Sequence, residues 1–175
     1  MKKILLYSTK TGNTKKIADV IAKEINPDYF GDVAEFDALN IDSEDLIIIG
    51  GWIDKGLMNK EVMDFITKLN KKNVAFYFTL GAYPNSMHAF DCINNIKKSF
   101  TANENNILAH YHCQGAIDPK LIEWMNNLPS EHSHSPDENR INRWNDAKSH
   151  PNQEDFNSAK NFVSIIEKKL GELNV

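Results

Sequence analysis

Five short apolar runs alternate along the chain with stretches in which apolar residues recur at helical spacing, and this alternation is what most restricts the fold. The clearest run is LIII at residues 46–49, which is continuous and mostly β-branched, as in a strand covered on both faces. The runs that we predict to be strands are residues 3–7, 33–38, 46–49, 74–80 and 107–113. Strands that alternate with helices form parallel sheets with right-handed crossovers. The pattern therefore predicts an α/β fold, a doubly wound parallel sheet with helices on both faces.

The helices between these strands are predicted from the same periodicity. Their expected ranges are residues 14–25, 61–69, 86–100 and 153–170. The last one has a start signal, because Asn152 stands at the N-cap position and Asp155 can complete a capping box. We predict that residues 33–38 form a half-buried strand, since apolar and acidic residues alternate there, and that the third strand ends at Gly50-Gly51.

One segment, residues 116–151, does not fit the simple alternation. Asp118-Pro119 is typical of a helix start, and a second helix is predicted around residues 139–148, but much of the segment is polar and poor in aliphatic residues. The whole chain has 175 residues, which suits one domain and is short for two. We therefore expect residues 1–175 to form a single domain with a surface excursion at about 116–151.

The composition limits the functions to consider. The net charge of -4 argues against a nucleic-acid surface, and no apolar run has the length of a membrane-spanning helix. Cys92 and Cys113 are too few for a disulfide framework or a four-cysteine zinc site, which fits a reducing cytoplasm. His132, His134 and His150 lie in polar sequence without a well-spaced partner ligand, so we expect no metal site.

Three loops are expected to meet beyond the carboxyl ends of the strands, where parallel α/β sheets bind their ligands. They are residues 9–14, 51–56 and 79–84. The first, TKTGNT, offers hydroxyl, amide and backbone N–H donors at the start of a helix, where unpaired N–H groups and the helix dipole can hold a phosphate. It lacks the Gly-Lys-Ser/Thr of nucleoside triphosphatases and the Gly-x-Gly-x-x-Gly of dinucleotide-binding proteins. A terminal monophosphate suits such a loop.

The segment Thr9-Lys10-Thr11-Gly12-Asn13-Thr14 resembles the phosphate-binding loop of flavodoxins, Ser/Thr-x-Thr-Gly-Asn-Thr, at its usual place after the first strand. This resemblance implies a flavodoxin-like sheet of five parallel strands in the order 2-1-3-4-5. It also implies that FMN is the cofactor.

The resemblance further implies roles for the two other loops, which sandwich the flavin ring in flavodoxins. Trp52 would stack on one face of the ring and Tyr83 on the other. Gly56, or the Asp54-Lys55 linkage before it, would hold the peptide that flips on reduction to accept the N5–H. Asp54 would disfavour an anionic reduced ring and Lys55 would favour it, unless both are solvated. The implied cofactor-binding residues are Thr9, Lys10, Thr11, Gly12, Asn13, Thr14, Gly51, Trp52, Ile53, Asp54, Lys55, Gly56, Thr79, Leu80, Gly81 and Tyr83.

The segments GGWIDKGLMN, TLGAYPNSMHAF and CQGAIDPKL also resemble a branch of small flavodoxin-family proteins of anaerobic bacteria, some of which accompany a bilirubin reductase. The function implied is an FMN-binding electron-transfer protein that passes electrons to a partner reductase. An alternative is an FMN-dependent NAD(P)H oxidoreductase acting on a small organic acceptor, with residues 116–151 as a lid. A third hypothesis, an interaction module that has lost its cofactor, is disfavoured by the intact phosphate loop. The sequence identifies no catalytic residue.

Overall fold

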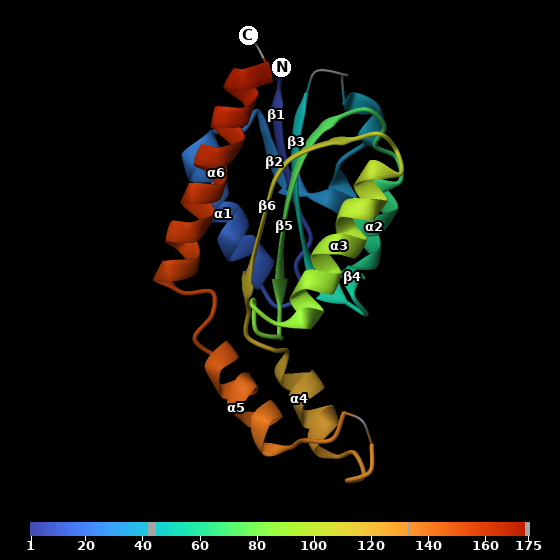
Figure 1. The fold of residues 1–175 in the computed structure, drawn as a ribbon, viewed down its shortest axis with the longest axis vertical. Coiled ribbons are helices and arrows are strands. Elements are labelled where there is room, and N and C mark those ends of the chain that lie inside the picture. The colour runs from blue at the N-terminus through green and yellow to red at the C-terminus, as the bar shows by residue number, and fades with distance from the viewer. Residues whose placement is uncertain (42–44, 133, 174–175) are drawn as a thin grey trace.

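The apolar runs of the sequence pair into a parallel sheet with the strand order β2-β1-β3-β5-β6 (Figure 1). The coordinates are a computed structural model that describes residues 1–41, 45–132 and 134–173. The strands of the parallel sheet are β1 (Lys3–Tyr7), β2 (Tyr29–Asp32), β3 (Leu46–Asp54), β5 (Asn73–Leu80) and β6 (Asn106–Gln114). A short strand, β4 (Leu57–Met58), pairs antiparallel with the end of β3. With β4 left out of the count, this is the predicted order 2-1-3-4-5, so the doubly wound fold is confirmed.

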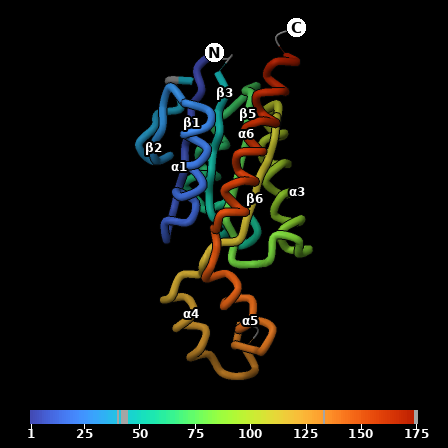
Figure 2. Tube along the Cα trace, turned by 90° about the vertical axis from the view of Figure 1, so that its left-hand side faces the viewer, coloured from blue at the N-terminus to red at the C-terminus, as the bar shows by residue number. Residues whose placement is uncertain are grey.

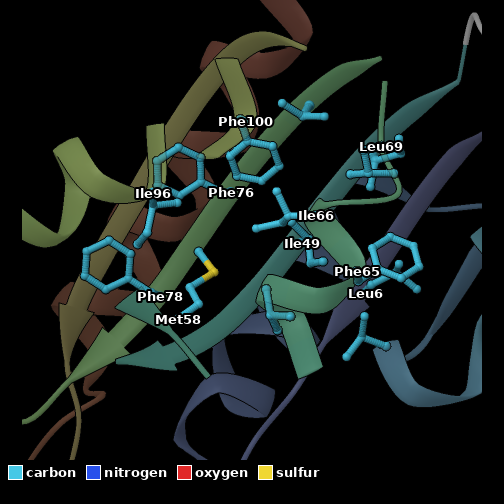
Figure 3. Packing of buried hydrophobic residues seen from close by; sticks show 14 of the residues in the cluster. Leu6, Ile49, Met58, Phe65, Ile66, Leu69, Phe76, Phe78, Ile96 and Phe100 are labelled. Carbon is cyan, nitrogen blue, oxygen red and sulfur yellow. The ribbon is translucent and has the colours of Figure 1, made fainter. Parts of the chain in front are cut away.

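Helices cover both faces of the sheet because successive strand residues point to opposite sides. In β1, Leu5 packs in the cluster that contains the buried residues of α1 and α6, whereas Leu6 packs with those of α2 and α3. Figure 3 shows Leu6 and its neighbours in the cluster on the side of α2 and α3. The helices are α1 (Asn13–Ile25), α2 (Lys60–Ile66), α3 (Met87–Thr101), α4 (Pro119–Asn126), α5 (Glu138–Ala147) and α6 (Gln153–Leu173). None of the helices in the described ranges is long and apolar enough to cross a membrane.

The predicted strand at residues 33–38 is wrong. The strand lies earlier, at Tyr29–Asp32, and is followed by two single 3-10 turns, Val33–Glu35 and Ala38–Asn40. The carboxylates of Asp32 and Asp37 cause these turns, because they accept hydrogen bonds from the N–H groups two residues later, at 2.9 and 3.0 Å. Asp37 of the alternating pattern thus caps a turn instead of facing solvent along a strand, and Asp32 just before the pattern does the same.

The predicted end of the third strand at Gly50-Gly51 is also wrong, since β3 continues to Asp54. Both glycines permit a close approach inside the sheet. A Cβ at Gly50 would lie 1.9 Å from Tyr77 Cζ, and one at Gly51 would lie 2.8 Å from Asn59 Oδ1. The glycines therefore make room for buried side chains and do not stop the strand.

The segment at residues 116–151 extends beyond the carboxyl ends of the strands, away from both chain termini (Figures 1 and 2). The chain runs from the end of β6 into α4 and α5 and then back to the sheet as α6. The capping box predicted for α6 is confirmed, because Asn152 Oδ1 accepts from the Glu154 N–H at 2.9 Å and Asp155 Oδ2 accepts from the Asn152 N–H at 2.8 Å. The single-domain assignment of residues 1–175 stays a prediction, and residues 42–44, 133 and 174–175 lie outside the described ranges.

Candidate functional site

A cavity of about 300 Å³ lies where the carboxyl ends of the strands meet α4 and α5. We call these two helices, with the loop that precedes α4, the cap (residues 115–126 and 138–147). The strands β3 and β5, the loops after β1 and β5, and the first residues of α1 and α3 contribute the lining residues Lys10, Thr11, Asn13, Trp52, Ile53, Thr79, Leu80, Gly81, Ala82 and His88. The cap contributes Gly115, Ala116, Ile117, Asp118, Leu121, Met125, Arg143 and Trp144. The cavity thus combines polar groups from the sheet edge with a largely apolar cap.

The loop after β1 is held in shape by its own side chains. The Gly12 N–H donates to Thr9 Oγ1 at 3.0 Å, and Asn13 Nδ2 donates to Thr11 Oγ1 at 3.1 Å. Gly12 has a φ of 89°, a left-handed conformation that favours glycine, and it precedes the first residue of α1. Within the described residues, no side chain caps α1 and its first turn carries no acidic residue. The first N–H groups of α1 and its positive dipole end therefore remain available to an anion.

Thr14 has a different place from the other hydroxyls of this loop. Its side chain is buried and lies 2.9 Å from the hydroxyl of Thr79, with Gly51 O at 3.5 Å. Thr14 therefore connects the loop to β3 and β5 in the interior of the protein. It does not line the cavity, whereas Thr79 does.

Lys10 connects the loop, Trp52 and the cap. Its Nζ lies 5.5 Å from the centroid of the Trp52 ring and 3.3 Å from Asp118 Oδ2. Asp118 caps α4 by accepting from the Lys120 N–H at 2.9 Å, and this bond, followed by the contact with Lys10, lowers the pKa of the Asp118 carboxyl. The acid that faces the cavity is thus already paired with a cation.

Asn59 is a site-shaping residue that the sequence reasoning missed. It is buried, its Oδ1 accepts from the Trp52 N–H at 3.2 Å, and its own N–H donates to Trp52 O at 2.9 Å. Its Nδ2 donates to Ser8 Oγ at 2.8 Å and to Glu61 Oε2 at 2.7 Å. These bonds fix the backbone of Trp52 relative to the loop after β1. The only signal in the sequence is its position just before the predicted helix at 61–69.

Asp54, Lys55 and Gly56 do not line the cavity. Lys55 and Gly56 have φ values of 49° and 84° and form the two-residue turn between β3 and β4, with the positive φ pair of a type I′ hairpin. A Cβ at Gly56 would have Asn95 Nδ2 of α3 as its nearest neighbour, at 4.0 Å. In the structure the predicted N5 loop is therefore a hairpin whose tip lies by α3.

Tyr83 does not line the cavity either. Its hydroxyl donates to Asp146 Oδ2 at 2.7 Å, which raises the pKa of the phenol and joins the loop after β5 to α5. It borders a separate hollow with Gln114, Asp146 and His150. The predicted site residues that the structure brings together around the cavity are Lys10, Thr11, Asn13, Trp52, Ile53, Thr79, Leu80 and Gly81. Those that it places outside the lining are Thr9, Gly12, Thr14, Gly51, Asp54, Lys55, Gly56 and Tyr83.

The cap residues of the lining were also missed. The loop before α4 fits closely against the sheet edge, because Asn13 Nδ2 donates to Ala116 O at 2.8 Å and a Cβ at Gly81 would lie 2.8 Å from Ile117 Cγ1. Trp144 was the available signal, since a large aromatic residue in an otherwise polar stretch indicates a buried helix face.

Comparisons with known proteins agree with the fold. The model of the flavodoxin domain family matches residues 4–164. The chain is 32% identical over 169 residues to the flavodoxin-like domain-containing protein BilS of Clostridioides difficile, covering 93% of this chain and 94% of BilS. It is 28% identical over 168 residues to the uncharacterized protein MJ0298 of Methanocaldococcus jannaschii, covering 95% and 98%.

A solved structure shares the fold. Oxidised flavodoxin 2 from Bacillus cereus superimposes with a TM-score of 0.63 at 16% identity, over 97% of this chain and 99% of that one. The family match, the identity to BilS and the strand order lead to one conclusion: this chain belongs to the flavodoxin domain family.

Proposed function

We propose that this protein binds FMN in the cavity beneath the cap and passes the electrons of FMN to a partner reductase. Membership of the flavodoxin family supports FMN as the cofactor and electron transfer as the general function. When bound, FMN supplies the redox chemistry, and the chain sets its orientation, its surroundings and its access to water.

The observation that carries the proposal is the meeting of two groups in one cavity, an uncapped helix N-terminus and an aromatic ring. The start of α1, with Thr11 and Asn13, offers donors for a phosphate. Trp52 offers a planar surface for a flavin ring. The donor set of this chain therefore fits both ends of FMN.

Other residues, in the lining and behind it, shape the environment of the cofactor without binding its phosphate or stacking on its ring. Leu121, Met125 and Trp144 of the cap are apolar and exclude water from that side of the cavity. Asn59 and Thr14 hold Trp52 and the loop after β1 in place without lining the cavity themselves. Tyr83 joins this group in the proposal as the residue that links the loop after β5 to the cap.

The phosphate assignment is tested with Thr11→Val. Because a hydrogen bond to a charged group contributes about 1.5–3 kcal/mol, we expect FMN to bind about tenfold or more weakly, while riboflavin, which has no phosphate, binds as before. Quenching of flavin fluorescence during titration measures both affinities. Thr101→Val, at the exposed end of α3, is the matched control and should change neither. Equal losses for FMN and riboflavin would show that Thr11 acts elsewhere than on the phosphate.

The alternative function, an FMN-dependent NAD(P)H oxidoreductase, is favoured by the apolar cap over the cavity. The carrier proposal predicts that NADH or NADPH alone leaves the flavin absorbance of the FMN-loaded protein unchanged under anaerobic conditions. Rapid bleaching by either nucleotide would replace the carrier proposal with the oxidoreductase.

The partner proposal has its own test. The resemblance to small flavodoxin-family proteins that accompany a bilirubin reductase makes a reductase of that kind the first partner to assay. FMN-loaded protein, reduced with stoichiometric dithionite, should be reoxidised when this reductase and bilirubin are both present and not with either one alone. Cys92 and Cys113 are free, buried thiols, which supports a reducing cytoplasm as the place where this exchange occurs.

A further inference from the structure

We propose that Arg143 is a charge partner for the reduced cofactor, which its guanidinium stabilises relative to the oxidised one. This inference rests on the proposed binding of FMN. It assigns a role to a cap residue that lies outside the three loops predicted from the sequence to bind the cofactor.

Arg143 is a cation without a counter-charge among the described residues. It lies on α5 and lines the cavity, and its Nε is buried without a hydrogen-bond partner among the residues that the structure describes. Within the ranges that the structure describes, it forms no ion pair: Asp146, one turn later, accepts from Tyr83, and Asp118 pairs with Lys10. An arginine side chain stays protonated at all relevant pH values, so this charge is permanent.

The surroundings of Arg143 make the missing partner costly. The neighbouring lining residues of the cap, Leu121, Met125 and Trp144, are apolar. The buried Nε of Arg143 has lost hydration that a hydrogen-bond acceptor, best an anionic one, can replace. The cation is therefore suited to an anionic group of the molecule that occupies the cavity.

The size of the cavity indicates which anionic group this is. About 300 Å³ is at the lower end of ligand pockets, which favours a single ligand in the cavity over a cofactor together with a second substrate. The N–H groups at the start of α1 already serve the phosphate. The other negative charge of the cofactor is the one that the flavin ring acquires on reduction, and this is the charge that Arg143 can pair with. In that step, the oxidised ring takes up two electrons from a donor and one proton from solvent, and it gains one net negative charge.

The other charges at the cavity do not cancel this effect. Lys10 and Asp118 neutralise each other, and Asp54 and Lys55 lie outside the lining. The lysine, arginine and carboxylate groups of the lining therefore leave one net positive charge, that of Arg143. Binding of the reduced cofactor is thus favoured over binding of the oxidised one, which raises the two-electron reduction potential.

The test compares Arg143→Gln with the wild type, both loaded with FMN. We expect the affinity for oxidised FMN to change little and the affinity for reduced FMN to fall about tenfold. For a two-electron couple, a tenfold change corresponds to a potential lower by about 30 mV. Spectroelectrochemical titration measures the potential, and fluorescence quenching measures the affinity for oxidised FMN. Arg143→Lys, which keeps the charge, should retain most of the wild-type potential.

Lys148→Gln is the matched control, because it removes a positive charge from the exposed end of the same helix. An Arg143→Gln potential equal to those of the wild type and Lys148→Gln would overturn the inference while leaving FMN binding intact. Failure of the wild type to bind FMN would overturn the proposed function first. A further readout needs no FMN: Arg143→Met removes the unpaired guanidinium, so the cofactor-free variant should unfold at a higher urea concentration than the wild type. A lower urea midpoint for Arg143→Met would mean that Arg143 serves the fold and not the cofactor.

Discussion

Asn59 joins the hairpin end, the loop after β1 and the start of α2 through one buried side chain. Its amide satisfies the Trp52 N–H and the Ser8 hydroxyl, two groups that are far from each other in sequence. The arrangement explains why the strand glycine Gly51 tolerates no Cβ, since Asn59 Oδ1 occupies that space. A single polar residue therefore fixes the backbone from which the Trp52 side chain extends.

Replacement of Asn59 by Ala should affect stability and the site together. Buried partners left without hydrogen bonds cost about 1–3 kcal/mol, so we expect the free energy of unfolding to fall by about that amount and FMN to bind more weakly. Urea unfolding and flavin fluorescence measure the two effects. Asn157→Ala, at an exposed position of α6, should leave both unchanged. If Asn59→Ala lowers stability but binds FMN with wild-type affinity, Asn59 has no role in positioning Trp52.

The partly buried environment of His110 should make the stability of the protein depend on pH. It lies on β6 with its ring 5.5 Å from that of Phe76, its Nδ1 is buried without a partner in the described residues, and burial, followed by Lys97, His112 and Lys169, lowers its pKa to about 4. An unfolded histidine binds a proton near pH 6.5. Between these two values the unfolded state therefore holds more protons, and stability falls as the pH is lowered from about 6.5 to 4.

The expected loss is about 2 kcal/mol, because partial solvent exposure of His110 reduces the full effect of the shift. Urea unfolding at pH 7.5 and pH 4.5 measures it. His110→Phe keeps a ring beside Phe76 and cannot take up a proton, so its stability should depend less on pH. Equal losses in the variant and the wild type would assign the pH dependence to other groups.

At the scale of elements, β3 and β4 form a hairpin at the carboxyl end of the central strand. The sequence predicted a loop from residue 51 onward, yet β3 runs on to Asp54 and turns tightly at Lys55 and Gly56. The turn is stabilised by pairing of Ile53 with Met58 and of Asp54 with Leu57. Any peptide flip at Gly56 therefore takes place in the turn of a paired hairpin.

Two glycine substitutions should change the free energy of unfolding in opposite directions, one in this turn and one in a helix. Gly56→Ala should lower the free energy of unfolding by about 1–2 kcal/mol, because its φ of 84° is unfavourable for a residue with a Cβ. Gly171→Ala should raise it by about 0.5–1 kcal/mol, since Gly171 lies within α6 with open space around it. Urea unfolding measures both changes. A Gly56→Ala protein as stable as the wild type would mean that the turn relaxes to another conformation.

At the scale of the whole molecule, the cap and the sheet differ in how firmly they are held. The strands β3 and β5 are buried almost throughout, whereas the buried residues of α4 and α5 are Met125, Trp144 and Ala147. Regions with few buried apolar contacts open locally at low free-energy cost. The cap is thus the part of the molecule that admits a ligand most easily.

Hydrogen exchange should report this difference and its dependence on FMN. Amides of α4 and α5 are expected to exchange much faster than those of β5 without cofactor. With FMN in excess at about 100 times its Kd, which stabilises the liganded state by about 2.7 kcal/mol, exchange in the cap should slow strongly. Mass spectrometry of peptides from residues 118–126 and 138–147 follows this change. Unaltered exchange in these peptides upon FMN binding would show that the cap does not contact the cofactor.

The alternation of strands and helices follows from the sequence alone, and the resemblance of residues 9–14 to the flavodoxin phosphate loop leads to the family and the strand order. The binding of a phosphate by this loop stays a prediction. The physical reason is that pattern and motif are local: a continuous β-branched run needs cover on both faces, helical spacing defines one apolar face, and Gly12 next to small hydroxyl residues favours an anion-binding helix start. The tertiary structure decides which of these residues meet. It brings Trp52 and Lys10 together, turns Lys55 and Gly56 away, bonds Tyr83 to Asp146 and places Arg143 in the cavity. These outcomes depend on contacts between segments that are distant in sequence, and periodicity records which face of an element is buried but not which partner buries it.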